Sequence, residues 1–283
     1  MLTDTAIEAV VFAALEEDAP WGDVTSELFV PADATATAEL NAREPGVFSG
    51  GAVIVATFAA VSADVTVEVM LEDGDRFEAG DVIAVISGPA RAVLRGERIA
   101  LNLVQRMSGI ATLTAQFVAL VAGTKAHVVD TRKTTPGLRA LERHAVRSGG
   151  GYNHRFSLSD AVLAKDNHLA VLTAGGESVT DVIRSARAQL GHTTHLEVEV
   201  DRLEQIEPVL AGGVDTIMLD NFSLDDLRAG VAQVAGRALV EASGGVNLAT
   251  VADIAATGVD LISVGALTHS VRALDLGLDV RVR

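Results

Sequence analysis

The chain has 283 residues, of which 49% are hydrophobic and 21% charged, and its formal net charge at pH 7 is −16. This composition is that of a globular protein with one large or two medium domains, and it excludes a disordered chain. The chain has no cysteine, which excludes disulfides, thiolate nucleophiles and thiolate metal sites. The acidic excess and the low aromatic content of 4% argue against nucleic-acid binding.

Residues 1–109 predict a small, sandwich-like α+β domain. Ile7, Val10, Val11 and Leu15 recur at helical spacing, and no basic signal-peptide region precedes them, so we expect an amphipathic helix of the mature protein. Alternating polarity then predicts strands separated by glycine turns, in residues 35–41, 65–71 and 81–86.

The longest apolar run covers residues 50–61. It is shorter than the ~18 residues that indicate a membrane-spanning helix. We therefore expect a cytoplasmic protein that does not contact the membrane.

A helical pattern leads out of this first domain. Residues 95–107 place Ile99, Leu103 and Met107 on one stripe, and a second helix is expected over residues 110–120, after a break at Gly109. We place the domain boundary at this break. The domains are then residues 1–109 and 110–270, with the tail 271–283 joining the first.

From residue 127 onward, short apolar strands alternate with helical segments. The predicted strands are residues 127–131, 160–166, 195–201, 215–221, 238–244 and 260–267. The predicted helices between them are residues 177–190, 202–211, 224–235 and 248–258. This alternation indicates βαβ units and a parallel sheet. About six units favour an α/β barrel, with a doubly wound open sheet as the alternative.

The barrel is favoured because every predicted strand ends in polar or small residues. In chain order these are Arg132 and Lys133, Lys165 and Asp166, Glu197 and Glu199, Asp220 and Asn221, Glu241 and Ser243, and Ser263 and Gly265. Parallel strands of a barrel deliver their carboxyl ends to a single face. We therefore expect these side chains to converge.

Residues 130–158 are basic in an otherwise acidic chain. A solvated helix face explains Arg139, Arg143 and Arg147, which recur at helical spacing. It does not explain the cations that follow the strand ending at Val129, or those that follow three consecutive glycines at 149–151. Loops at strand ends are where binding and catalytic sites are built.

The convergent charges are unequally distributed along the chain, with cations on the early strands and acids on the late ones. Internal ion pairing is one interpretation. The other is two subsites, in which forked guanidinium donors hold a planar dicarboxylate and the acids face a phosphorylated sugar with Mg²⁺. The glycine-containing segments SGG at 243–245 and VGA at 264–266 precede predicted helices, where backbone N–H groups favour phosphate.

The same motifs carry a family resemblance. DTRKTTPGLR from Asp130, GGGYNHR from Gly149 and AKDNH from Ala164 occur in order with GDVTS, ERIALNLVQRMSGIAT, EVEVD, LDN, EASGG and VGALTHS. This series covers nearly the whole chain and resembles the quinolinate phosphoribosyltransferases. These enzymes transfer phosphoribosyl from phosphoribosyl pyrophosphate to quinolinate and release CO₂ and pyrophosphate.

The resemblance implies a role for each matching residue, with Lys133, Glu199 and Asp220 as the catalytic group and the last two near Mg²⁺. The residues implied to bind quinolinate are Thr131, Arg132, His154, Arg155, Lys165 and Arg98, the last reaching into the neighbouring site of a homodimer. The residues implied to bind phosphoribosyl pyrophosphate are Lys133, Glu199, Asp220, Ser243, Gly244, Gly245, Val264, Gly265, Ala266 and His269.

Three other functions fit parts of the pattern. A Schiff-base aldolase would use Lys165 or Lys133 as its nucleophile. A related transferase would act on another aromatic acid, and a non-catalytic protein would only bind anions. Assays with the respective substrates discriminate among these functions.

Overall fold

The computed structural model describes residues 2–165, 168 and 176–282. It divides into two compact units. The first unit comprises Met1–Ala115, Thr134–Gly150 and Leu267–Arg283, and the second comprises Gln116–Lys133 and Gly151–Ala266. The predicted domain boundaries at residues 109 and 270 stay a prediction, because compactness does not show which segments fold independently.

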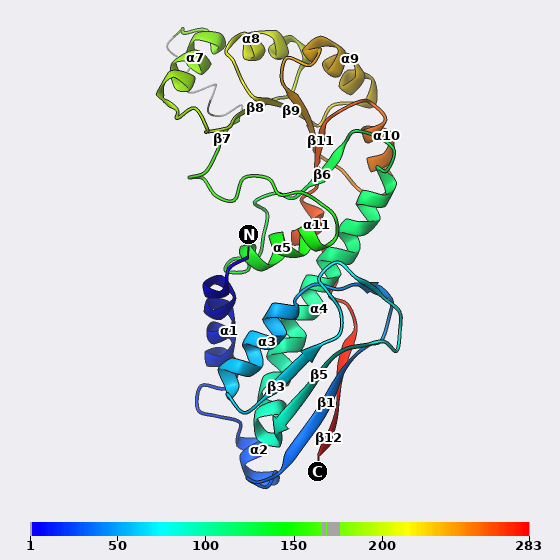
Figure 1. Cartoon of the computed structure of the whole chain (residues 1–283). Coiled ribbons are helices and arrows are strands. Elements are labelled where there is room, and N and C mark those ends of the chain that lie inside the picture. The colour runs from blue at the N-terminus through cyan, green and yellow to red at the C-terminus, as the bar shows by residue number, and fades with distance from the viewer. Residues whose placement is uncertain (1, 166–167, 169–175, 283) are drawn as a thin grey trace. The chain divides into compact units, whose positions relative to one another are not determined.

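The first unit contains a four-stranded sheet, a two-stranded sheet and the helices that pack on them (Figure 1). Its strands are β1 (Thr35–Ala42), β2 (Gly46–Val47), β3 (Thr66–Val69), β4 (Arg76–Phe77), β5 (Val82–Pro89) and β12 (Leu276–Val282). Its helices are α1 (Asp4–Asp18), α2 (Val24–Phe29), α3 (Gly51–Val61), α5 (Arg139–Ser148) and most of α4 (Ala90–Leu120).

The core of the first unit lies between the four-stranded sheet and helices α3 and α4. The strand order is β12-β1-β5-β3, and all three pairings are antiparallel. Strand β1 buries every second residue, from Ala36 to Ala42, because alternate side chains of a strand face one side of its sheet. Ile54 and Phe58 of α3 pack into the same core as Val104 of α4.

The predicted opening helix is confirmed, because α1 buries Ile7, Val11 and Leu15 and is capped by the side chain of Thr3. The predicted break at Gly109 is wrong, since α4 runs without interruption from Ala90 to Leu120. A Cβ at position 109 would overlap the backbone carbonyl oxygen of Arg272, within the first unit. Glycine is therefore needed there for close packing of the tail and not to end a helix.

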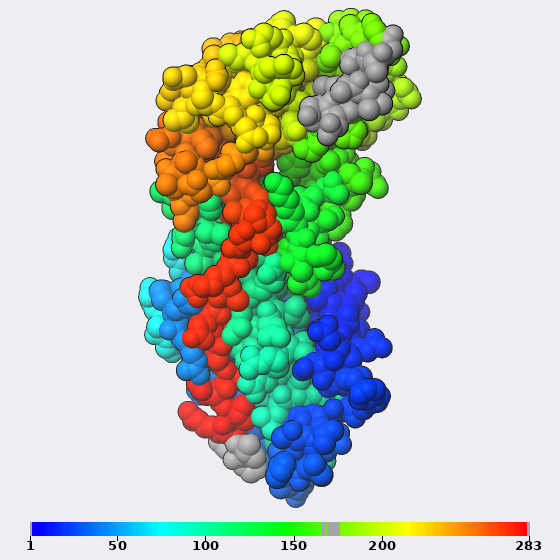
Figure 2. All heavy atoms as spheres, turned by 180° about the vertical axis from the view of Figure 1, so that it is seen from behind, coloured from blue at the N-terminus to red at the C-terminus, as the bar shows by residue number. Residues whose placement is uncertain are grey.

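The C-terminal tail returns to the sheet of the first unit. Strand β12 pairs antiparallel with β1, placing Leu278 opposite Leu40. The tail, red in Figure 2, runs alongside α4, where the Gln105 side chain donates to the Leu276 carbonyl oxygen at 2.7 Å. Among the described residues, no helix is long and apolar enough to cross a bilayer.

The second unit is a parallel α/β assembly. Its strands are β6 (His127–Val129), β7 (Val162–Ala164), β8 (Leu196–Val200), β9 (Thr216–Asp220), β10 (Leu239–Ser243) and β11 (Leu261–Ser263). Its helices are α7 (Val179–Gln189), a 3₁₀ turn (Leu203–Gln205), α8 (Ile206–Ala211), α9 (Leu224–Val234) and α10 (Val251–Ala255), and α11 (Ala266–His269) begins at its last residue. Figure 1 shows α7, α8 and α9 side by side along the outside of the sheet.

The strand order of the second unit indicates a barrel and rules out a doubly wound sheet. Strands β7 to β11 follow one another in chain order, and the first strand, β6, pairs with the last, β11. A doubly wound sheet would instead place its first strand in the interior and reverse the order there. In the described part of the chain, β6 and β7 form the two edges, and Tyr152 extends the β6 edge through a parallel bridge to Val129.

Candidate active site

A cavity of about 610 Å³ opens at the carboxyl ends of the strands of the second unit. The predicted site residues that line it are Thr131, Arg132, Lys133, His154, Arg155, Lys165, Glu199, Asp220, Ser243, Gly244 and Gly245. They lie up to 114 residues apart in the chain, from Thr131, which follows β6, to Gly245, which follows β10. The parallel strands bring both kinds of charge to one rim.

Other predicted residues are not among those that line this cavity in the described chain. Val264 is buried, and its N–H donates to the Val129 carbonyl oxygen at 2.9 Å, so its backbone joins β11 to β6. Gly265 and Ala266 follow it without lining the cavity. Arg98 and His269 are exposed residues of the first unit, and Asp166 lies outside the described residues.

Two arginines form a positive wall of the cavity. Burial, and after it the charge of Arg132, lower the pKa of the Arg155 guanidinium below its usual value. The Nε–H of Arg132 is buried and has no hydrogen-bond partner among the described residues. Repelling cations and an unpaired buried donor are both unfavourable in a protein that binds nothing there. This wall is therefore suited to an anion with several oxygens.

Lys165 and Glu199 form an ion pair across the cavity side of β7 and β8. The Lys165 side chain is 47% exposed, whereas that of Glu199 is only 12% exposed. Internal ion pairing, the alternative interpretation of the charge pattern, is thus correct for these two residues. Because one partner is largely solvated, the pair adds little stability and can be exchanged for ligand contacts.

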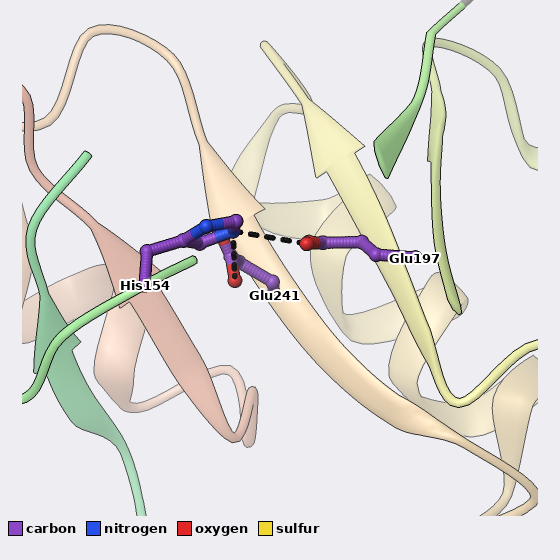
Figure 3. Close-up of side chains that lie close together, drawn as sticks. All are labelled: His154, Glu197 and Glu241. Carbon is purple, nitrogen blue, oxygen red and sulfur yellow. Dashed lines mark ion pairs between the residues drawn. The ribbon is translucent and has the colours of Figure 1, made fainter. Parts of the chain in front are cut away.

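Beneath the wall, His154 lies between two buried glutamates (Figure 3). Its Nε2 is 2.9 Å from a carboxylate oxygen of Glu197 and 3.7 Å from one of Glu241. Asp130, itself buried, accepts from the backbone N–H of His154 at 2.7 Å and from the Asn153 side chain at 2.6 Å. The position of the imidazole is therefore fixed from two sides.

The hydrogen bonds of His154 define its protonation state. Its Nδ1 accepts from the N–H of Arg155 at 2.7 Å, which requires that Nδ1 carry no proton and that Nε2 donate to Glu197. Burial lowers the pKa of His154, but the Glu197 hydrogen bond and the charge of Glu241 outweigh burial and raise it overall. The geometry shows the neutral ring, and the acids around it make protonation easier than in a free histidine.

Glu241 keeps its proton at neutral pH. Burial, followed by the negative charge of Glu197, raises its pKa from 4.5 to about 8. The Oε1 atom of each glutamate is buried without a hydrogen-bond partner among the described residues. Two carboxylates this close cannot both ionise without a compensating cation, so they hold a proton between them.

Two donor sets of the second unit are suited to a metal ion. His154, Glu197 and Glu241 offer ligand atoms within 4.8 Å of one another, and one imidazole with two carboxylates is a donor set that transition ions accept. Glu199 and Asp220 offer oxygen atoms alone, at a more open part of the cavity. A few carboxylates together with substrate oxygens are what Mg²⁺ prefers, so the second set fits magnesium.

Sequence reasoning missed two residues of this region, Met218 and Leu163, which line the cavity. Asn221, Glu241 and Ser263 also line it, and they were among the strand-end residues expected to converge, although no role was assigned to them. Met218 and Leu163 are apolar residues within strands, and nothing in their pattern separates them from core residues.

Comparisons with known proteins cover almost the whole chain. Residues 23–108 match the family model described as quinolinate phosphoribosyl transferase, N-terminal domain, and residues 110–279 match the C-terminal domain model of the same family. A nicotinate-nucleotide pyrophosphorylase (carboxylating) from Mycobacterium leprae is 45% identical, over 99% of this chain and 100% of its own length.

Two further relatives agree with this result. A probable nicotinate-nucleotide pyrophosphorylase (carboxylating) from Bacillus subtilis is 43% identical, over 93% of this chain and 90% of its own length. The crystal structure of NadC from Streptococcus pyogenes superposes with a TM-score of 0.94 at 40% identity, covering 100% of this chain and 99% of that one. The resemblance stated from the motifs is thereby confirmed.

The raised pKa of Glu241 predicts a pH-dependent stability. Its folded pKa of about 8 lies above its unfolded value near 4.5, so its contribution to stability is present below pH 4.5 and is lost as pH rises through 8. Glu241→Gln should therefore remove part of the fall in unfolding free energy between these pH values. Urea unfolding of both proteins from pH 4 to 9 measures the difference. The exposed Glu16→Gln serves as control, and equal pH profiles for wild type and Glu241→Gln would contradict the assignment.

Proposed function

Since the chain belongs to the quinolinate phosphoribosyl transferase family, we propose that it transfers phosphoribosyl from phosphoribosyl pyrophosphate to quinolinate, with loss of CO₂. The products are nicotinate mononucleotide and pyrophosphate, and the reaction is a step of NAD biosynthesis. The observation that carries the proposal is the pair Arg132 and Arg155, two cations in one cavity with a buried donor unpaired among the described residues.

The positive wall suits quinolinate. This substrate is a flat pyridine ring with two adjacent carboxylates, and two guanidinium groups can each present forked donors to one of them. Lys165 supplies a further cation once it leaves Glu199, and Thr131 lies at the same rim. His154 lies close to the wall, and its Nδ1 accepts from the backbone N–H of Arg155, so the imidazole helps to hold the segment that carries one of the two arginines.

The opposite rim suits phosphoribosyl pyrophosphate. Glu199 and Asp220 would hold Mg²⁺, which would neutralise the pyrophosphate and orient it as a leaving group. Ser243, Gly244 and Gly245 offer a hydroxyl and backbone N–H groups to phosphate oxygens at the end of β10. Both acids also face the positive charge that develops on the ribose as pyrophosphate departs.

The reaction needs no protein nucleophile. The ring nitrogen of quinolinate attacks C1 of the ribose, while the bond from C1 to the pyrophosphate oxygen breaks and its electron pair leaves with pyrophosphate. The bond between ring C2 and its carboxylate then breaks, CO₂ departs, and C2 takes up a proton. The protein contributes alignment of two polyanions that repel each other in water. Lys133 lines the same cavity, and its proposed position is between the two subsites.

The expected assembly is a homodimer in which Arg98 of one subunit enters the site of the other. Arg98 is exposed and belongs to the first unit, so it is free to meet a second copy of the chain. A cytoplasmic location is proposed with it, in line with the reaction's soluble substrates.

The decisive experiment mixes the chain with quinolinate, phosphoribosyl pyrophosphate and Mg²⁺ and measures CO₂ and pyrophosphate together. Release of both in equal amounts is expected. Nicotinate in place of quinolinate is the matched control, since it lacks the carboxylate that is lost. Pyrophosphate release with nicotinate alone would assign another aromatic acid, and a lysine adduct trapped by borohydride with a keto substrate would favour an aldolase.

Arg132→Ala tests the division into two subsites. Loss of a buried charged donor to a carboxylate should weaken quinolinate binding by about 100-fold, while phosphoribosyl pyrophosphate binding changes by less than about threefold. Calorimetric titration with each substrate measures both. The control is Arg237→Ala, which removes a surface arginine of the same unit paired with Glu207. An equal loss for both substrates would refute the division.

Hybrid dimers test the proposed role of Arg98. Arg98→Ala and Lys133→Ala subunits should each be inactive alone, but a hybrid would contain one site with both residues intact. Random exchange makes half of the dimers hybrid, so about a quarter of wild-type activity should return. Arg132→Ala mixed with Lys133→Ala is the control, because these residues line one cavity of a single chain and cannot complement. Absence of recovery despite measured exchange would place Arg98 outside the neighbour's site.

A further inference from the structure

The turn after β9 is held by an asparagine in an unusual conformation. Asn221 has a φ of 58°, in the left-handed region, where the described chain has one other residue that is not glycine, Ala235. Ala235 ends helix α9, a common place for this conformation. Asn221 ends no helix and instead lies on the rim of the cavity. Strain of this kind persists where the surrounding contacts impose it.

The contacts of Asn221 reach two neighbouring strand ends. Its side-chain N–H donates to Oδ2 of Asp220 at 2.7 Å, and its backbone N–H donates to the carbonyl oxygen of Ser243 at 2.9 Å. Asp220 and Ser243 are also partners in the parallel register of β9 and β10. One residue thus connects the carboxylate at the end of β9 to the loop that leaves β10.

Gly244 packs closely against this asparagine. A Cβ at position 244 would collide with the side-chain oxygen of Asn221, and would lie 2.6 Å from its Cγ and 2.9 Å from its backbone nitrogen. Gly244 also has a φ of 94°, which side-chain-bearing residues rarely adopt. At the adjacent Gly245 nothing lies within 4 Å of the same point, so the close fit is specific to Gly244.

We propose that Asn221 is a positioning residue that locks the Asp220 carboxylate to the glycine loop at Ser243–Gly245. The amide orients one oxygen of Asp220, and the bulk of the side chain fills the space that a residue other than glycine would need at position 244. The carboxylate that would meet the ribose and the backbone that would meet a phosphate are therefore set at a fixed spacing. This inference rests on the proposed function, since it assigns both groups to phosphoribosyl pyrophosphate.

A sugar phosphate would contact the Asp220 carboxylate and the glycine loop at Ser243–Gly245 at the same time. Because Asn221 fixes the spacing between these two groups, neither has to be ordered when the ligand binds. The guanidinium wall makes none of the contacts described for Asn221. Loss of the lock should therefore affect phosphoribosyl pyrophosphate and spare quinolinate.

Asn221→Gly is the first test, because glycine adopts a φ of 58° without strain and so preserves the fold while removing the amide. The thermal midpoint should be unchanged or slightly raised, quinolinate affinity should be unchanged, and phosphoribosyl pyrophosphate affinity in Mg²⁺ should fall about tenfold. Calorimetric titration measures both ligands. Ala235→Gly is the matched control, since it relieves the other left-handed residue away from the cavity and should leave both affinities intact.

Asn221→Asp is the second test, because it keeps the size of the side chain but replaces the donor with a charge that repels Asp220. A loss of phosphoribosyl pyrophosphate affinity at least as large as that of Asn221→Gly is expected. Gly244→Ala should also weaken binding of this ligand, and by less in the Asn221→Gly background, because the side-chain atoms with which the new Cβ collides are then absent.

The outcomes separate the two proposals. A wild-type chain that does not bind phosphoribosyl pyrophosphate would overturn the proposed function and this inference with it. A wild-type chain that binds it, with Asn221→Gly or Asn221→Asp binding equally well, would overturn the inference alone. Equal loss of both ligands together with a lowered thermal midpoint would assign Asn221 a purely structural role, which also overturns it.

Discussion

The pairing of the first strand of the second unit with the last is the constraint on which the site depends. Because β6 lies beside β11, the row of six strands runs from β6 to β7, and it curves so that the carboxyl ends of all six border one cavity. Arg132 and Lys165 follow the two edge strands of this row, β6 and β7, and they could not line one cavity if the sheet were flat. The chemistry of the protein is therefore a consequence of topology first and of residue type second.

Two contacts between side chains of the cavity differ in how readily they can be exchanged for ligand contacts. Lys165 and Glu199 form a pair in which the lysine is 47% exposed, and such pairs contribute about 1 kcal/mol or less. The contact of His154 with Glu197 is buried on both sides, and breaking it would leave an uncompensated charge in the interior. We infer that ligands displace the contact of Lys165 with Glu199 and leave the contact of His154 with Glu197 intact. The exposed lysine then moves when a ligand binds, while the buried side chains stay in place.

The sequence was sufficient for the strand ends and insufficient for their contacts. Charged residues after apolar strands, such as Lys133 and Asp220, were predictable because parallel strands align their ends. The pairing of Lys165 with Glu199 was not, since it depends on neighbouring strands and on rotamers. Gly109 was misread as a helix break because a pattern cannot reveal that a distant backbone segment occupies the space of its missing Cβ. The left-handed conformation of Asn221 is likewise imposed by tertiary contacts.

The proton on Glu241 resolves an apparent contradiction in the charge of the site. A binding wall for a dianion must carry a positive excess, yet two glutamates lie beneath it in a chain with a net charge of −16. Were both ionised, they would offset the positive charge of the wall, where Arg155 already interacts with Glu197, and the low local dielectric would make this effect large. Burial and the adjacent Glu197 instead raise the pKa of Glu241 to about 8, so that one acid is neutral. The remaining carboxylate, Glu197, accepts a hydrogen bond from the neutral His154, and its single negative charge is smaller than the two positive charges of the wall.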